Sequence, residues 1–110
     1  MINAKKKGNK NENDFANWLQ ENGIKAWRNS SSGAGLYKGD INNSLDLTIE
    51  CKSVANLNVQ DAWKQVKRDS ETAHNTPVLA IHYNGFPEKT WLIVMHSEEW
   101  LEWLKKVKEI

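Results

Sequence analysis

Apolar residues recur along this chain with two different spacings, and the two spacings predict where its helices and strands lie. Apolar positions three and four residues apart indicate helices with one buried face, and these occur at about 10–21, at about 59–74 and from 97 onward. Strict alternation of apolar and polar residues indicates a half-buried strand at 45–54. Further strands are predicted at 24–27, 36–42, 77–83 and 90–96. This order predicts one α/β domain over residues 1–110, with a mixed central β-sheet flanked by helices.

Large aromatic side chains lie on several of these apolar faces. Trp63 belongs to the apolar stripe of the second helix, and Trp100 and Trp103 belong to that of the last helix. The last two strands carry apolar residues on both faces, as expected of strands inside a covered sheet. We therefore expect most tryptophans to lie in the core, although Trp91, Trp100 and Trp103 are also candidates for a dimer interface.

Two acidic residues and a lysine are predicted to meet where two strands lie side by side. Glu50 and Lys52 share one face of the strand at 45–54, and Asp40 lies in the preceding strand. Holding two carboxylates and an ammonium group together is costly unless a divalent cation and a polyanion balance the charges. This combination is typical of metal-dependent phosphodiesterases.

Asp46 is an alternative partner for Glu50, because it points to the same face of the strand. The four residues between them span roughly 13 Å of extended chain, which is too far for both carboxylates to bind one ion. We therefore interpret Asp46 as a polar residue close to a hairpin turn.

The first predicted helix places a third acidic residue on its buried face. Glu12 shares a stripe with Phe15, Ala16 and Leu19, at positions i, i+3, i+4 and i+7. By itself, Glu12 is better explained as a glutamate near the helix amino terminus, where it meets the helix dipole favourably. Because the acidic pair described above is also present, Glu12 becomes a candidate site residue.

A small polar loop follows the first predicted strand. Arg28 ends this strand, and the loop at 29–35 includes Ser30 and Ser32. Glycine and serine allow backbone N–H groups to approach a phosphate closely, and an arginine can bind two phosphate oxygens. The loop is predicted to be too small and polar to pack, and a flexible connector is the alternative to a binding role. We favour a substrate-binding loop because it leads directly to Asp40.

In this order the residues resemble the PD-(D/E)xK nuclease superfamily, and in particular its Holliday junction resolvases of the archaeal type. The resemblance covers about residues 8–68. It rests on five residues in order: Glu12, Arg28, Asp40, Glu50 and Lys52. Two positions depart from the family pattern, since Gly39 replaces the usual proline and Asn13 stands where these resolvases often carry an arginine. The implied fold is the restriction-endonuclease-like fold.

The resemblance implies a site for one or two Mg²⁺ or Mn²⁺ ions, which prefer hard oxygen ligands. The expected ligands are Asp40, Glu50, the backbone carbonyl of Cys51 and, from the helix side, Glu12. Lys52 is expected to stabilise the charge that develops during hydrolysis. Gln65, on the second helix, is a further candidate for arranging the site, and a plain surface glutamine is the alternative. The expected products are a 5′-phosphate and a 3′-hydroxyl.

The implied activity is that of a homodimer that makes paired nicks in four-way or otherwise branched DNA. One site per chain requires two copies for a symmetric cut, and a two-fold dimer supplies them. Two alternatives stay open. One is a general or restriction-related endonuclease that acts on linear or flapped DNA, and the other is a non-catalytic DNA-binding module.

The charge distribution is uneven although the net charge is only +1. Residues 1–39 contain seven Lys/Arg and three acids, whereas residues 40–110 contain eight and eleven. Lys5, Lys6, Lys7 and Lys10 suggest a basic arm at 1–7, next to the first helix, that contacts DNA phosphates and makes binding salt-dependent. A solubilising tail is the alternative.

Other features of the sequence argue against several protein classes. No apolar run approaches the roughly 20 residues of a membrane span, and the lysine-rich start lacks the apolar part of a secretory signal. We therefore expect a cytoplasmic protein with no membrane partner. Cys51 is the only cysteine and is expected to pack in the core, pointing away from Glu50 and Lys52. The histidines are expected to be structural or surface residues: His74, His82 and His96.

Overall fold

The computed structural model describes residues 4–30, 39–53, 57–83 and 85–108, with side chains from Lys10 onward. Its elements in chain order are α1 (Ala4–Glu21), β1 (Ala26–Arg28), β2 (Ile41–Asn43), β3 (Leu47–Lys52), α2 (Val59–Ala73), β4 (Thr76–Ile81), β5 (Leu92–Val94) and α3 (Ser97–Lys108). The five strands form one sheet in the order β1-β2-β3-β4-β5. Adjacent strands run antiparallel except β3 and β4, which are parallel and are connected through α2. The sheet is therefore mixed, as the sequence predicted.

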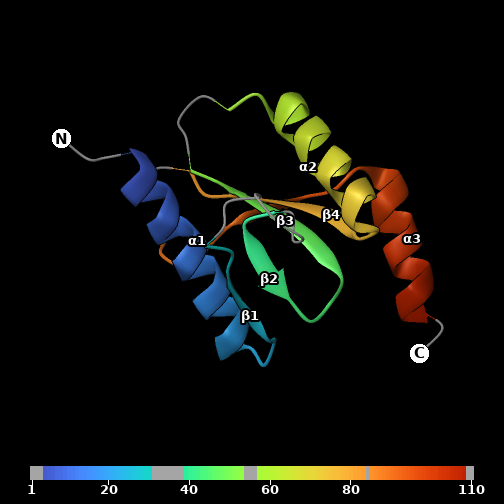
Figure 1. Cartoon of the computed structure of the whole chain (residues 1–110), viewed down its shortest axis with the longest axis horizontal. Helices are drawn as coiled ribbons and strands as arrows, with labels where there is room; N and C mark the ends of the chain where they lie inside the picture. The colour runs from blue at the N-terminus through green and yellow to red at the C-terminus, as the bar shows by residue number, and fades with distance from the viewer. Residues whose placement is uncertain (1–3, 31–38, 54–56, 84, 109–110) are drawn as a thin grey trace.

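The sheet is covered by α1 on one face and by α2 on the other (Figure 1). On β3, Ile49 and Cys51 belong to the same apolar cluster as Phe15 of α1. On β4, Leu79 and Ile81 pack with Ala62 of α2. Because neighbouring residues of a strand point to opposite faces, Glu50 points toward the α2 side while Cys51 packs under α1. The predicted core position of Cys51 is confirmed.

The hairpin between β2 and β3 is held by the side chain of Asn43. Its amide nitrogen donates to the carbonyls of Ile41 and Leu47 at 3.2 and 2.8 Å. Its amide oxygen accepts from the backbone N–H groups of Leu45 and Leu47 at 3.0 and 3.2 Å. Asp46 lies in this turn with a φ of 58°, so its interpretation as a turn residue is confirmed. The turn fixes the register in which Ile41 faces Ile49.

The first helix begins at Ala4, six residues earlier than the predicted start at Lys10. Alanine and lysine have high helix propensity, so they extend a helix without needing an apolar face. The prediction of a basic arm over residues 1–7 is therefore wrong from Ala4 onward, because Lys5, Lys6 and Lys7 belong to α1. Their side chains and residues 1–3 lie outside the described part of the chain.

The carboxy-terminal part is much more exposed than the sequence predicted. Leu92 and Ile93 of β5 are each 48% exposed, and β5 is an edge strand of the sheet. Trp100 and Trp103 of α3 are 53% and 45% exposed, and none of this helix's described residues is buried. The predictions that β5 is an inner strand and that these two tryptophans lie in the core are wrong.

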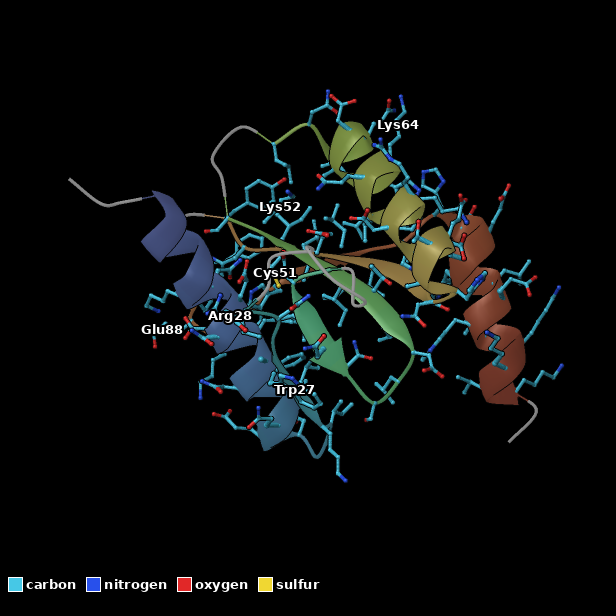
Figure 2. The ribbon with its side chains drawn as sticks, viewed as in Figure 1. Trp27, Arg28, Cys51, Lys52, Lys64 and Glu88 are labelled. Carbon is cyan, nitrogen blue, oxygen red and sulfur yellow. The ribbon has the colours of Figure 1, made fainter. Side chains whose placement is uncertain are left out.

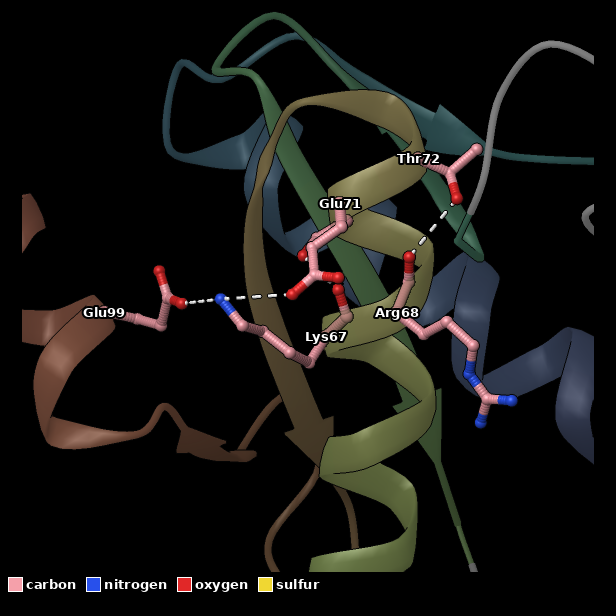
Figure 3. Close-up of polar contacts among 6 residues, drawn as sticks. Lys67, Arg68, Glu71, Thr72 and Glu99 are labelled. Carbon is pink, nitrogen blue, oxygen red and sulfur yellow. Dashed lines mark hydrogen bonds and ion pairs between the residues drawn. The ribbon is translucent and has the colours of Figure 1, made fainter.

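A few side-chain contacts connect α3 to α2 (Figures 1 and 3). Lys67 of α2 pairs with Glu99 of α3 and, at 3.8 Å, with Glu71 one helical turn away. His96, directly before α3, stacks on Trp63 with a ring separation of 4.7 Å. These contacts hold the beginning of α3, and four of its apolar residues remain exposed: Trp100, Leu101, Trp103 and Val107.

No helix in the described ranges has the length and apolar character needed to cross a membrane.

Candidate active site

Asp40, directly before β2, lies opposite Glu50 of the adjacent strand β3. Ile41 pairs with Ile49 in an antiparallel register, so the residues one step further along, Asp40 and Glu50, face each other on the α2 side. A carboxylate oxygen of Asp40 accepts a hydrogen bond from the backbone N–H of Cys51 at 2.8 Å. The Glu50 side chain is buried, since the residue is only 6% exposed. The structure thus brings together the two acids that the sequence pattern singled out.

The backbone of Asp40 is held from both neighbouring strands. Its N–H donates to the carbonyl of Ile49 at 2.7 Å, and its carbonyl accepts from the N–H of Asn29 at 2.8 Å. The side-chain amide of Asn29 also donates to the carbonyl of Gly39 at 3.0 Å. Asn29 is only 5% exposed, so the prediction that the loop from residue 29 is too polar to pack is wrong at this position.

Gly39 allows the chain to reach Asp40 in this geometry. Its φ is +92°, and an added Cβ would lie 3.0 Å from the carbonyl oxygen and 3.1 Å from the nitrogen of Ile49. Proline, which fixes φ near −65°, cannot adopt this conformation. The departure from the proline usual in the family therefore has a local reason, because here the residue before the aspartate lies in the left-handed region.

The surroundings of Glu50 change its ionisation. Burial raises the pKa of Glu50 to about 8, and the charge of Asp40 together with a hydrogen bond between the two carboxyls adds to the increase. The positive charge of Lys52 acts in the opposite direction on this pKa, whereas Asp69 of α2 adds a smaller increase. At neutral pH the pair therefore holds a proton when no cation lies beside it.

Lys52, Arg28 and Glu12 complete the charged cluster. Arg28 lies 3.7 Å from Glu12 in an ion pair whose side chains are 25% and 17% exposed. Burial and the charge of Asp40 raise the pKa of Glu12, while Arg28 and Lys52 oppose the increase. Figure 2 shows Arg28, Cys51 and Lys52 in the region where α1 meets the sheet. The predicted site residues therefore lie close enough to interact electrostatically: Glu12, Arg28, Asp40, Glu50 and Lys52.

The cysteine between the two charged residues of β3 is held in the apolar layer. Burial raises the pKa of the Cys51 thiol well above its usual value, and the negative charges of Asp40 and Glu12 add to the increase. The thiol is therefore protonated at neutral pH, and only the backbone of Cys51 is available to the site.

Other predicted residues are not gathered at this cluster. Gln65 is exposed on α2, and Ser30 is exposed after β1. Lys10 is exposed and pairs with Asp14 at 2.6 Å. Ser32, and the side chains of the three lysines at 5–7, lie outside the described residues. Within the described part, no three His, Cys, Asp or Glu side chains lie close enough together to form a metal site by themselves.

Sequence reasoning missed Asn29 and Asp69. The periodicity of α2 gives no reason to single out Asp69, because its relation to Glu50 depends on how the helix crosses the sheet. Asn29 has a weak signal in the sequence. An asparagine that directly follows a strand is well suited to bond a neighbouring backbone, as it does here.

Comparisons with known proteins agree with this arrangement. The family model described as "Phage putative PDDEXK endonuclease" matches residues 3–110. Among solved structures, the chain is similar to Archaeoglobus fulgidus Hjc, a Holliday junction resolvase from an archaeal hyperthermophile, with 23% identity and a TM-score of 0.55. That match covers 79% of this chain and 70% of the other, and it confirms the predicted restriction-endonuclease-like fold. No curated protein matches the sequence.

Proposed function

The chain belongs to the phage PDDEXK endonuclease family, and from this membership we propose that it is a metal-dependent endodeoxyribonuclease. The observation that carries the proposal is the buried pair Asp40 and Glu50, held face to face with Lys52 two residues further along the same strand. Such a pair is destabilising in the absence of a cation, because burial and mutual repulsion raise the pKa of Glu50 to about 8. An arrangement that is costly for the fold is characteristic of a functional site.

The donor atoms of this pair fit a hard divalent cation. Asp40 and Glu50 would hold Mg²⁺ or Mn²⁺ together with the backbone carbonyl of Cys51, and Glu12 would contribute from α1. When bound there, such an ion supplies Lewis-acid activation of water and neutralises charge on the phosphate. Without a cation, Glu50 keeps a proton at neutral pH, and this proton supplies the positive charge that a bound cation would supply.

The cationic side chains of the cluster have separate roles in this proposal. Lys52 stabilises the negative charge that grows on the phosphate oxygens during hydrolysis. Arg28, oriented by its ion pair with Glu12, binds a phosphate next to the one that is cut. The basic residues of α1 add phosphate contacts that make binding depend on salt.

We further propose that the substrate is branched DNA, such as a four-way junction, and that the active form is a homodimer. The fold similarity to a junction resolvase supports the choice of substrate class. The exposed apolar residues of α3 and β5 support the choice of assembly. The helix α3 carries acids in its first turn and lysines in its last, so two copies packed antiparallel about a two-fold axis would bring opposite charges together.

The proposal is tested by cleavage of three DNA substrates: a four-way junction, a flap and a linear duplex, each with Mg²⁺ and with EDTA. We expect cleavage only with Mg²⁺, a preference for the four-way junction, and coupled nicks in a cruciform plasmid. Equal cleavage of the linear duplex would instead favour the general or restriction-related endonuclease. Binding without cleavage under any of these conditions would favour the non-catalytic module.

A further inference from the structure

A hollow of about 320 Å³ lies beside the charged cluster, between α1 and the segment that joins β4 to β5. Its wall includes Asn11 of α1, Ser53 after β3, and His82 and Trp91 from the two ends of the β4–β5 connection. The roles proposed above for the charged cluster use none of these four residues. The volume is at the lower limit of the range usual for ligand pockets, so a small group suits it best.

Three residues that line the hollow are directly connected to residues of the charged cluster. Ser53 directly follows Lys52, and Asn11 directly precedes Glu12. The backbone N–H of His82 donates to the carbonyl of Lys52 at 2.9 Å. A group held in the hollow would therefore lie beside the backbone of Lys52 at the end of β3 and next to Glu12 of α1.

Two aromatic side chains, His82 and Trp91, form part of the wall of the hollow and contact neighbouring rings. The indole N–H of Trp91 donates to the side-chain oxygen of Asn11 at 3.0 Å, and its ring packs edge-on against Phe15 at 5.0 Å. The ring of His82 contacts Phe86 at 5.9 Å and Trp91 at 6.2 Å, both edge-on. The side-chain nitrogen of Asn11 has no partner among the described residues and is available as a donor beside these rings.

The charges around the hollow nearly cancel. Lys10 and Lys89 are balanced by Asp14 and Glu88, which also belong to the wall. Both lysines are already paired, Lys10 with Asp14 at 2.6 Å and Lys89 with Glu21 at 2.8 Å. A phosphate needs an excess of unpaired positive charge, so the hollow suits a neutral, planar, hydrogen-bonding group instead.

We propose that this hollow binds one unpaired nucleobase of the DNA, next to the phosphate that is cut. This inference rests on the nuclease function proposed above, and it specifies the substrate as DNA with an unstacked base at the cleavage point. Aromatic rings offer a stacking surface to any base, while Asn11 and Ser53 offer hydrogen bonds to its edge. A base of fully paired DNA can enter the hollow only after its base pair is broken, which costs free energy.

Oligonucleotides that carry the fluorescent base 2-aminopurine test this inference without cleavage. The probe is placed at each of the positions around the cut in flap DNA, and binding is followed in EDTA. We expect a fluorescence change at one position, and loss of that change in His82→Ala. His74→Asn is the matched control, because His74 is an exposed residue with a φ of 58° that asparagine tolerates. It should keep the signal.

A second measurement needs no variant protein. Replacing the responsive nucleotide by an abasic site should weaken binding of the wild-type chain by about tenfold or more, since base stacking is lost. Equal affinity for abasic and intact DNA, or a 2-aminopurine signal unchanged in folded His82→Ala, would overturn the inference. Cleavage with Mg²⁺ but no responsive position would reject the nucleobase site and leave the nuclease proposal intact. A chain that does not bind DNA at all would reject both.

Discussion

Two regions of this molecule carry unfavourable features of opposite kinds: buried charge in one, and exposed apolar side chains in the other. Around Asp40 and Glu50, the sheet buries the carboxyl group of Glu50 next to that of Asp40 and holds Asp40 with backbone hydrogen bonds. The electrostatic free energy of this burial is unfavourable and is offset by the stability of the surrounding fold. Around β5 and α3, the chain leaves large apolar side chains in contact with solvent and holds the helix by a few side-chain contacts. The first region buries charge of the kind found at functional sites, and the second exposes apolar surface of the kind found at interaction sites.

The largest expected effect comes from neutralising the buried acids. Glu50→Gln and Asp40→Asn should each reduce Mg²⁺-dependent cleavage of a four-way junction by at least about a thousandfold, because the cation loses a ligand. Their unfolding free energy should not fall, because Glu50→Gln removes the cost of keeping Glu50 protonated and Asp40→Asn removes a charge that helps to raise the pKa of Glu50. Cleavage rates and urea denaturation measure the two effects.

Asp46→Asn is the matched control for these two substitutions. It changes a carboxylate to an amide in the adjacent turn, and asparagine accepts the φ of 58° found there. It should leave cleavage within about twofold of wild type. Wild-type turnover in Glu50→Gln would remove the acid pair from the proposed mechanism.

Gly39 offers the next largest effect, on folding rather than on chemistry. Gly39→Ala should lower the unfolding free energy by about 3 kcal/mol, because it combines a left-handed backbone with a methyl group 3.0 Å from the Ile49 carbonyl oxygen. Gly23→Ala separates the two causes, since Gly23 has a φ of +85° with no atom within 4 Å of the added carbon. It should cost only about 1 kcal/mol. Equal costs would mean that crowding at Gly39 is relieved by small shifts of β3.

The acid pair should also make stability depend on pH when no divalent cation is present. The pKa of Glu50 rises from its usual 4.5 to about 8 in the fold. Between these values the unfolded chain has lost the proton that the folded chain keeps, so stability falls as pH rises and the loss is complete above about pH 8. At about 1.4 kcal/mol per pH unit, wild type should lose about 2 kcal/mol relative to Glu50→Gln between about pH 6 and about pH 7.5, as measured by denaturation in EDTA. Parallel curves for the two proteins would show that Glu50 ionises normally.

The smallest effect on folding is expected in the exposed region. Trp103→Lys should change the unfolding free energy of the monomer by less than about 0.5 kcal/mol, because its side chain is largely in solvent. If α3 forms the proposed interface, the same substitution should shift sedimentation from dimer to monomer at micromolar concentration. Trp27→Lys, which alters an equally exposed tryptophan on β1, should leave the sedimentation unchanged. Dimers that survive Trp103→Lys would place the interface elsewhere.

The sequence predicted well the features that depend on spacing within one element. Alternation on β3 correctly separated Cys51 from Glu50, and the hairpin turn predicted between the strands of Asp40 and Glu50 is confirmed. The helix of residues 59–73 was predicted to within one residue. In each case the determining interactions are local, so the pattern alone contains the information.

The sequence predicted poorly what depends on how elements cover one another. Apolar residues on both faces of β5 and on one face of α3 indicated burial, yet periodicity does not reveal whether another element lies against that face. The packing of Asn29 was missed for a related reason. Its partners, Gly39 and Asp40, are about ten residues away, and only the pairing of β1 with β2 brings them together.

The contacts of Asn43 have a consequence for how the length of this chain can vary. By bonding residues on both sides of the turn, Asn43 fixes the number of residues in the hairpin as well as its shape. One residue inserted between 43 and 47 would leave the apolar pattern of β3 intact but shift its pairing, so that Asp40 would face an apolar neighbour. The length of the turn therefore determines whether Asp40 and Glu50 face each other. Substitutions within the turn are expected to change the stability of the fold, whereas insertions and deletions are expected to change whether Asp40 and Glu50 face each other.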